Sequence, residues 1–348
     1  LLAREAGFQF NQNGGRGAAS SLFLRGSASL QVLVLVDGVP INKQDASGAV
    51  RLEHWMLDQI ERVEIVRGNV SAIYGSGAIG GVIQVFTKRG AGQPSAQLSA
   101  EVGSRSSSKL SASVQGALGD QGRTKIAAGV ATNRTDGFSA LNTAQSPNAN
   151  PDADGYRNGN WSLSLSQDVV QGHTLGFRST RSTGHFDFDS SFDTPTDTHL
   201  GKTQVDATSV FSENKFTANW LSKLTISQSR DRNNNDYQTA FAFKDSYTTQ
   251  NRIANWSNTV ALGDAVSVTA GLESQRQSVN VDDGFGGLYQ RKRPVRAVFA
   301  GVQGQFGAHS LQANVRRDAA EGLPRKTTGY LGYGLDFTKE WKVTASAS

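Results

Sequence analysis

From Ala96 onward the sequence alternates between apolar and polar residues with a period of two. Leu110, Ala112 and Val114, for example, alternate with serine residues. Successive side chains of a β-strand point to opposite faces of a sheet, so this period is typical of strands with one apolar and one polar face. A helix would need apolar residues three and four positions apart, and no such pattern recurs here. The sequence therefore predicts a long series of half-buried strands.

About thirteen such segments follow one another, and the connections between them alternate in length. The segments begin near residues 96, 109, 123, 160, 174, 201, 216, 250, 266, 294, 309, 326 and 340. The short connections are residues 119–122, 170–173, 213–215, 263–265 and 307–308, and the long, polar ones are residues 133–159, 184–200, 231–249 and 281–293. Bacterial outer-membrane barrels have short periplasmic turns and longer loops outside. We therefore predict an antiparallel transmembrane β-barrel over residues 95–348.

Aromatic residues gather at the strand ends beside the short connections. They are Phe211, Phe216, Phe306, Phe337 and Trp341. An aromatic girdle at one membrane interface explains this position, and core aromatics of a soluble β protein are the alternative. The longest purely aliphatic run, residues 32–36, is too short for a transmembrane helix. A membrane location therefore requires a barrel.

The ends of the sequence also bear on the prediction. A closed barrel of one bacterial chain has an even number of strands, whereas residues 337–348 end in mid-pattern, and the start has neither methionine nor a signal peptide. We therefore expect a chain truncated at both ends. Cysteine is absent, which excludes disulfides and thiolate metal sites. The net charge of +5 comes without a basic stripe of interleaved aromatics, so nucleic acid is not expected as a partner.

Residues 1–90 are mixed in pattern and contain a glycine-rich segment. Gly75-x-Gly77-x-x-Gly80 has the spacing of a dinucleotide-binding motif. A phosphate site needs a strand before the glycines and a helix N-terminus after them. Here a helix-compatible stretch, residues 70–74, precedes them and a β-branched run, residues 82–85, follows. We interpret the glycines as a sharp turn between two elements. Strands are expected over 21–25 and 31–37, and a short amphipathic helix over 54–59.

Several motifs of this first part resemble one known family. They are Phe23-Leu24-Arg25-Gly26, Val34-Leu35-Val36-Asp37-Gly38-Val39-Pro40, Val66-Arg67-Gly68, Ala72-Ile73-Tyr74-Gly75 and Ala78-Ile79-Gly80-Gly81-Val82-Ile83. In this order they resemble the plug domain of TonB-dependent outer-membrane receptors. The resemblance implies a mixed α+β plug over residues 1–92 inside a barrel of 22 strands. It also implies outer-membrane lipid as surroundings and, as partner, TonB with its inner-membrane energising complex. The TonB box and the first strand and helix of family plugs are absent from this sequence.

Within the family the sequence is most similar to the cobalamin (vitamin B12) transporters. The similarity lies in residues 12–15 leading into 20–23, in the spacing of the plug loops, and in acidic motifs of two long loops. It implies uptake of cobalamin, driven by TonB, without chemistry on the substrate. A receptor for a ferric siderophore or haem shares the fold and is the alternative.

The acidic motifs predict a calcium site. Asn150, Asp152 and Asp154 place oxygen side chains at alternate positions before a glycine, a spacing that suits a hard cation. Residues 186–189 and Asp197 lie in the next long loop and are able to complete the coordination. The resemblance implies as ligands Asn150, Asp152, Asp154, Asp187, the carbonyl of Phe188, and Asp197. One family carboxylate falls at Ser139 here, which weakens the set. Solvated acidic loops with Asx-turns are the alternative.

Further site residues are expected on the plug. By family position, substrate contacts fall on Ser20 and Ser21 in one loop and on Ser47 in another. Arg25 and Arg67 are expected to be buried against lumen-facing carboxylates, because an unpaired buried guanidinium is costly. The candidate partners on inward-facing strand positions are Glu101 and Glu273.

An outer-membrane barrel enzyme and a soluble β-rich adhesin are the remaining alternatives. A hydrolytic barrel needs a Ser-His-acid set on adjacent strands. The five histidines lie apart, at two short connections, in a long loop and in the plug, without such partners. The sequence therefore favours a receptor over an enzyme.

Overall fold

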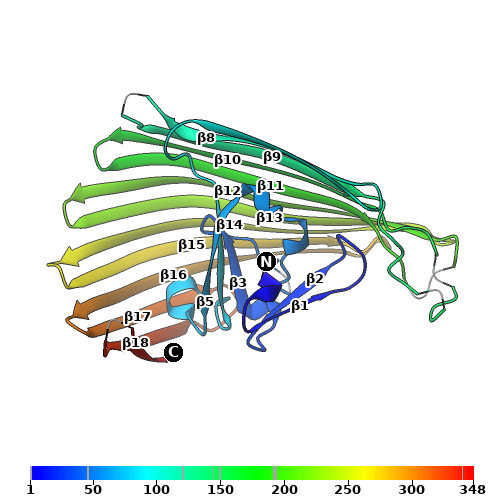
Figure 1. Ribbon diagram of the computed structural model, residues 1–348. Coiled ribbons are helices and arrows are strands. Elements are labelled where there is room, and N and C mark those ends of the chain that lie inside the picture. The colour runs from blue at the N-terminus through cyan, green and yellow to red at the C-terminus, as the bar shows by residue number, and fades with distance from the viewer. Residues whose placement is uncertain are drawn as a thin grey trace.

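The protein consists of one large curved sheet and a small mixed unit on its concave face (Figure 1). The computed structural model describes residues 2–44, 47–119, 121–142, 144–148, 150–190, 194–338 and 340–348. Among the helices of these residues, none has the length and hydropathy to cross a membrane.

Thirteen strands form the large sheet, which confirms the number expected from the alternation. Each strand pairs antiparallel with the strands before and after it in sequence, from β7 to β19. The strands are β7 (Ser95–Gly103), β8 (Ser107–Leu118), β9 (Thr124–Thr135), β10 (Tyr156–Val170), β11 (His173–Asp187), β12 (Thr198–Thr217), β13 (Trp220–Gln238), β14 (Phe243–Leu262), β15 (Val266–Asp282), β16 (Leu288–Phe306), β17 (His309–Ala320), β18 (Lys326–Asp336) and β19 (Lys342–Ala347).

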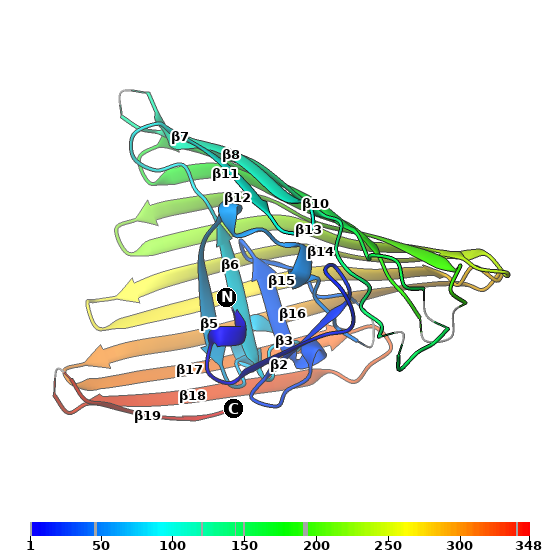
Figure 2. The same cartoon turned by 45° about the vertical axis from the view of Figure 1, so that its right-hand side comes forward.

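The two ends of these strands differ. At one end of the strands, the short-turn end, neighbouring strands are joined by short connections such as residues 171–172, 218–219 and 307–308. At the opposite end, the long-loop end, they are joined by longer connections such as residues 136–155 and 188–197. Figure 2 shows the strands fanning out from the long-loop end, with the plug between the two ends. This segregation agrees with the expected barrel topology.

Two predicted loops are strand instead. Residues 231–249 and 281–293 were expected to be long loops, but β13 and β14 are joined by 239–242 alone, and β15 and β16 by 283–287. These strands have 17 to 20 residues, more than the 9–11 that a membrane crossing needs. Their ends therefore extend beyond the membrane, where both faces carry polar residues that stay in strand pairing. The turn expected at 213–215 lies at 218–219, because β12 continues to Thr217.

The expected aromatic girdle is partly corrected. Phe216, Phe306, Phe337 and Trp341 are exposed near the short-turn end. Phe211, however, lies on the inward face of β12, where its ring packs over Gly176 and beneath the guanidinium of Arg178. Parity along the strand decides this, since Phe211 is five positions, an odd number, from the outward-facing Phe216.

The small unit, called the plug below, has two sheets and short helices. A hairpin of β1 (Phe8–Gln12) and β2 (Ser20–Leu24) stands beside a four-stranded sheet in the order β4-β3-β6-β5. Its strands are β3 (Val32–Val36), β4 (Val39–Pro40), β5 (Ile60–Arg67) and β6 (Gly81–Thr87), and its helices are η1 (Leu2–Arg4), η2 (Ser29–Gln31), η3 (Leu52–His54), η4 (Leu57–Gln59) and α1 (Ser71–Tyr74). Strand β3 runs parallel to β6, so both are covered on two faces, which explains their continuous Val/Ile/Leu runs.

The helix expected over 54–59 is two separate 3-10 turns, η3 and η4. The carbonyl of His54 accepts hydrogen bonds from Asn158, Asn160 and Ser182 of the large sheet. That oxygen is therefore not left for a regular intrahelical bond, and contact with the sheet overrides the local helical pattern.

The glycine-rich segment is a turn, as its context predicted. Gly75 ends α1 with φ of 92° and Gly81 begins β6 with φ of 152°, a region that favours glycine. A side chain at Gly80 would overlap Ser27, so this glycine allows a close approach. Helix α1 comes directly before the glycines and strand β6 directly after them, which is the reverse of a phosphate site, so the dinucleotide interpretation is excluded for this segment.

Candidate functional site at the long-loop end of the lumen

The plug contacts the wall of strands through His54. The imidazole Nδ1 lies 3.0 Å from the phenolic oxygen of Tyr156 on β10, and the ring stacks beside Phe186 on β11 with centroids 6.1 Å apart. Gly184 lies directly behind the ring, where a Cβ atom would overlap the imidazole. A glycine on the wall thus forms the recess that the buried histidine fills.

The charged residues next to His54 are also buried. Glu53 accepts a hydrogen bond from Ser20 and lies 3.4 Å from Arg51, whose other nitrogen donates to Asn233 on β13 at 3.3 Å. Burial raises the pKa of Glu53 above its usual value, although the charge of Arg51 opposes this shift. Burial, together with the positive charges of Arg51 and His185, lowers the pKa of His54 to about 3. His54 is therefore neutral at physiological pH.

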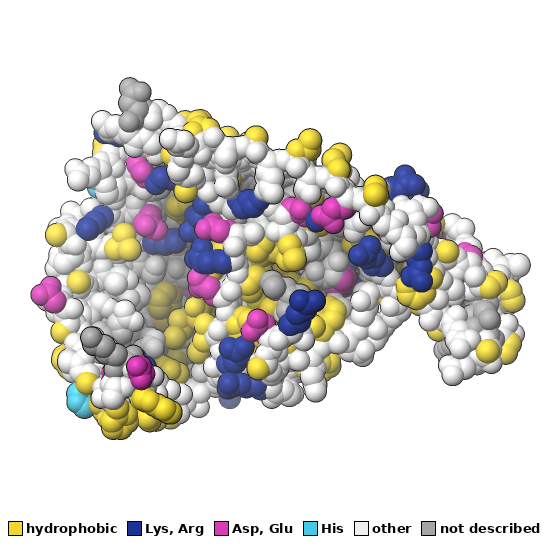
Figure 3. Space-filling model, viewed as in Figure 1, with side chains coloured by type: hydrophobic (Ala, Val, Ile, Leu, Met, Phe, Trp, Pro, Cys, Tyr) yellow, Lys and Arg dark blue, Asp and Glu magenta, His cyan; other side chains and the backbone are white. Residues whose placement is uncertain are grey.

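Two further ion pairs join plug and wall. Lys109 on β8 lies 2.9 Å from Asp58 of the plug and 3.2 Å from Glu101 on β7. Lys43 of the plug lies 3.8 Å from Asp231 on β13. Acidic and basic side chains are interspersed over this side of the molecule (Figure 3). The contact between plug and wall is thus largely polar and paired.

The predicted arginine pairings are not found among the described residues. Arg67 lies on edge strand β5 and its partner is Glu5 of the plug, at 3.7 Å. Arg25 and Gly26 both have positive φ and form the tight turn after β2, which leaves Arg25 exposed with no carboxylate at ion-pair distance in the described part of the chain. Arg67 lines a cavity whose other lining residues belong to the wall, but its ion-pair partner lies on the plug. Turn geometry and the edge position of a strand, which motif order does not reveal, decide these partners.

The two predicted carboxylates lie on the wall and have wall partners. Glu101 pairs with Lys109, and Glu273 lies 2.6 Å from Arg316, which also contacts Asp318 at 3.0 Å. Arg316 is buried and reaches the plug, because a Cβ at Gly75 would lie 3.4 Å from its guanidinium. Glu273 therefore acts at the plug contact through Arg316 and not through Arg67.

The acidic loops converge, as the sequence suggested, but with one different member. Carboxylate oxygens of Asp152, Asp154 and Asp189 all lie within 4.8 Å of one another. Burial, helped by the charges of Asp189 and Asp152, raises the pKa of Asp154 to about 7, although Ala140 N–H donates to it. Three hard oxygen donors brought together in this way suit a calcium-like cation.

The other predicted ligands have local partners. The side chain of Asn150 donates to the carbonyl of Asp197 at 2.9 Å, and Asp187 accepts from the Gly155 N–H at 3.1 Å. Asp197 itself accepts from the Thr194 N–H at 2.9 Å. Phe188 N–H donates to the carbonyl of His199. Asn150 and Asp197 thus connect the two loops, while Asp187 and Phe188 flank the cluster. Residues 186–189 were expected to contribute, but the resemblance implied Asp187 and Phe188, because spacing alone does not show which carboxylate of this run points toward Asp152 and Asp154.

Ser139 replaces the expected carboxylate but still belongs to the cluster. Its hydroxyl donates to Asp189 at 3.1 Å. The plug reaches the same place through the loop between β1 and β2. A Cβ at Gly15 would lie 3.5 Å from the Asp154 side chain, and one at Gly17 would lie 2.5 Å from the Tyr156 ring. Plug and acidic loops therefore form one surface.

The predicted substrate residues lie on the plug. The hydroxyl of Ser20 is buried against Glu53, Ser21 is partly exposed on β2, and Ser47 is exposed and accepts from the Ala49 N–H at 3.2 Å. Ser21 and Ser47 are therefore more accessible than Ser20, whose hydroxyl the buried polar contact occupies.

An aromatic ladder, which the sequence did not reveal, runs from the plug contact to the loop tips. It comprises Phe186, Phe188, His199, Tyr237, Phe243 and Phe285. Neighbouring ring centroids are 4.2 to 5.8 Å apart. His199 is paired with Tyr237 and Tyr237 with Phe243 in the strand register, so these three side chains share the inward face. The sequence did not predict this row of rings, because residues 184–200, 231–249 and 281–293 were interpreted as loops.

Comparison with known proteins gives matches for the plug and for the whole chain. Residues 1–82 match the TonB-dependent Receptor Plug Domain. Over its whole length the chain is 31% identical to the vitamin B12 transporter BtuB of Photobacterium profundum, and it spans 55% of that relative. The vitamin B12 transporter BtuB of Vibrio cholerae (strain O395) is 30% identical over 99% of the chain, again with 55% of its length covered.

Solved structures agree on the fold. A mutant of the ferric enterobactin receptor PfeA of Pseudomonas aeruginosa has a TM-score of 0.76 at 18% identity, over 96% of this chain and 56% of that one. The FrpB iron transporter of Neisseria meningitidis has a TM-score of 0.79 at 15% identity, over 99% and 61% of the two chains. Residues 1–82 are thus identified as a TonB-dependent receptor plug domain, and the whole chain is similar in sequence to vitamin B12 transporters and in fold to ferric-chelate receptors.

Proposed function

We propose that this protein is a receptor that takes up cobalamin across the outer membrane with energy supplied through TonB. The observation that carries the proposal is the identity of 31% with a vitamin B12 transporter, which extends over plug and wall alike. The solved iron-chelate receptors are less than 20% identical and support the fold alone. A bulky ligand would rest on the plug beside Ser21 and Ser47, below the aromatic ladder, since large flat rings supply contact area at little entropic cost.

The contact between plug and wall is of a kind that can open and close again. Ion pairs such as Lys109 with Asp58, and the hydrogen bonds to the carbonyl of His54, are exchangeable with water. Of the wall, only Val205 and Ala207 belong to the apolar core of the plug among the described residues. Displacing the plug would therefore expose little apolar surface, and its polar groups would be hydrated when the contact opens.

We also propose that calcium orders the two acidic loops. Asp152, Asp154 and Asp189 would hold the ion, and Asn150 and Asp187 stand next to them. The donor set fits, because three carboxylates so close together repel one another without a cation, and because Asp154 is also buried. When bound, calcium supplies the positive charge that lets the carboxylates converge and fixes the loops over the plug.

The test is a binding assay on the full-length receptor in detergent. Cobalamin, a ferric catecholate and haem are each titrated in the presence of calcium and in the presence of a chelator. We expect saturable binding of cobalamin that weakens on chelation. Binding of an iron chelate alone would overturn the substrate assignment, and cobalamin binding that is indifferent to chelation would overturn the role of calcium.

A further inference from the structure

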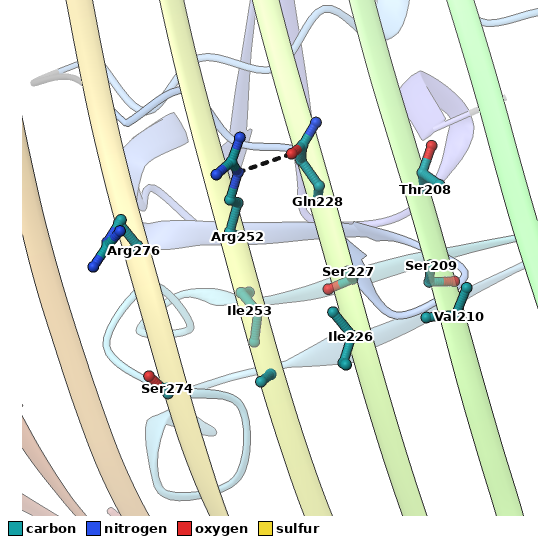
Figure 4. Close-up of a pocket in the computed structure, with 11 residues that line it drawn as sticks. Thr208, Ser209, Val210, Ile226, Ser227, Gln228, Arg252, Ile253, Ser274 and Arg276 are labelled. Atoms are coloured by element: carbon teal, nitrogen blue, oxygen red, sulfur yellow. Dashed lines mark hydrogen bonds between the residues drawn. The ribbon is translucent and has the colours of Figure 1, made fainter.

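Five consecutive strands of the wall carry an arginine on the outward face, away from the plug. This arginine belt comprises Arg230, Arg252, Arg276, Arg296 and Arg317, on β13 to β17. Strand register places Arg252 directly opposite Arg276. Figure 4 shows both side chains on the near face of the sheet, with the ribbon of the plug behind the strands. The belt therefore faces the surroundings of the protein and not the lumen.

The belt lies at a constant height. Arg252 is ten residues from Leu262, where β14 reaches the short-turn end, and Arg276 is ten residues from Val266, where β15 leaves it. The other three arginines lie eight to ten residues from the same end of their strands. A transmembrane strand needs about 9–11 residues. The belt is therefore one membrane thickness above the short turns.

The outward face below the belt is apolar. It presents large side chains at alternate positions, among them Leu224, Ile226, Leu272, Val298, Val302 and Val315, all of them exposed. The structure describes these five strands completely, and no charged side chain lies on their outward face between the short turns and the belt. Phe306 marks the opposite border, as an interfacial aromatic does. The apolar band thus ends at the arginines.

The central arginines of the belt have no protein counter-charge. Arg252 donates to Gln228 at 2.9 Å, and among the described residues no carboxylate is at ion-pair distance from Arg252, Arg276 or Arg296. Like charges directly opposite each other destabilise an antiparallel pair. The exception is at one end of the belt, where Asp206 lies opposite Arg230 in the strand register and pairs with Arg181. An anion from outside the chain is needed to balance Arg252, Arg276 and Arg296.

We propose that the arginine belt binds the phosphate groups of a phosphorylated glycolipid in the outer leaflet. The short turns of such barrels face the periplasm, so the opposite edge of the apolar band lies at the outer headgroups. Guanidinium groups bind phosphate through paired hydrogen bonds, and adjacent arginines such as Arg252 and Arg276 can share one phosphate. The belt would fix the height of the receptor and surround it with an ordered ring of lipid.

The experiment uses the full-length receptor in detergent, titrated with diphosphoryl lipid A and followed by native mass spectrometry. The triple variant Arg252→Gln/Arg276→Gln/Arg296→Gln should retain the lipid on the order of a hundredfold more weakly. The matched control Lys202→Gln/Lys244→Gln/Lys292→Gln removes the same charge from the outward face closer to the long loops, and should bind as the unmodified receptor does. The single variant Arg276→Gln, whose folding is less at risk, should show a severalfold loss.

Three results would overturn the proposal. Dephosphorylated lipid A that binds as tightly would show that acyl chains alone are recognised. Equal losses in the two triple variants would show a response to total charge. Displacement of the lipid by inorganic phosphate at comparable concentration would show a free-anion site. Heat-modifiable electrophoretic mobility is recorded for each variant to confirm that it is folded.

Discussion

The imidazole of His54 and the phenol of Tyr156 meet at 3.0 Å across the boundary between plug and wall. The same plug residue offers its carbonyl to Asn158, Asn160 and Ser182. One residue of the plug thus satisfies polar groups from two neighbouring strands. Because all these groups are buried, each would be left unpaired if His54 moved, which costs more than a surface hydrogen bond is worth.

Gly184→Ala should displace the histidine. The added Cβ would overlap the imidazole, and such overpacking costs about 1–3 kcal/mol. We expect a lower midpoint of thermal unfolding and faster proteolysis of the plug in the full-length receptor. Gly159→Ala is the matched control, because Gly159 lies on the neighbouring strand and a Cβ there meets nothing within 4 Å. Equal behaviour of the two variants would show that the recess is not needed.

Acid should loosen the plug through His54. Its pKa is lowered to about 3 by burial and by Arg51 and His185, whereas in the unfolded chain it is about 6.5. The unfolded state therefore binds the proton first, and stability falls as pH drops from about 6.5 toward 3, by up to about 1.4 kcal/mol per pH unit. Glu53, with its raised pKa, acts in the opposite direction.

Comparison of the receptor with a His54→Gln variant isolates this effect. Thermal unfolding midpoints are measured between pH 7 and the acid limit of folding for both proteins. The variant should show a shallower loss in acid, because Glu53 and the other acidic groups are common to both. If the unfolding midpoints of the two proteins fell in parallel with pH, the assignment of His54 as neutral and buried would be contradicted.

Much of the wall was predictable from the sequence because its signal is periodic. The alternation of apolar and polar residues predicted the thirteen strands, and the alternation of short and long connections predicted the short-turn end and the long-loop end. Beyond the membrane that signal fails, since polar residues occupy both faces of the strands. Asn233 and Tyr237 therefore lie on paired strands where polarity suggested loop. The aromatic ladder was missed for this reason.

The plug was predictable in its motifs but not in its contacts. Arg67 and Glu273 were each identified as site residues, yet they lie on separate networks. Partner choice depends on which strand is an edge and on where a turn directs a side chain, and neither is encoded locally. Lys109, Asp58 and His54 are among the residues that form the actual contact, and no spacing rule singles them out.

Lys109 should couple the plug to the wall measurably. It lies 2.9 Å from Asp58, and both side chains are less than one-third exposed. A double-mutant cycle with Lys109→Gln and Asp58→Asn should give a coupling energy of about 1 kcal/mol in thermal or denaturant unfolding. The wall pair Lys125 and Asp168, at 3.3 Å, is the control, since neither residue belongs to the plug. Its removal should leave plug proteolysis unchanged.

The same pair predicts a pH window. Burial raises the pKa of Asp58, but the hydrogen bond and charge of Lys109 outweigh burial and hold it below its usual value. The stabilisation is therefore present above about pH 4 and is lost as pH falls through the lowered pKa. A coupling energy that stays constant into strong acid would contradict the assignment.

Calcium should stabilise the acidic loops through Asp154. In the full-length receptor we expect calcium to raise the thermal unfolding midpoint. The free energy of unfolding should rise by roughly 2–4 kcal/mol at calcium concentrations well above the dissociation constant. Asp154→Asn should abolish most of this response, since it removes a buried carboxylate that faces Asp152 and Asp189. Without calcium the same variant should be as stable as the unmodified receptor or more so, because the repulsion is relieved. Asp264→Asn, in a short turn far from the loops, should keep the full response, and an unchanged response in Asp154→Asn would rule out the site.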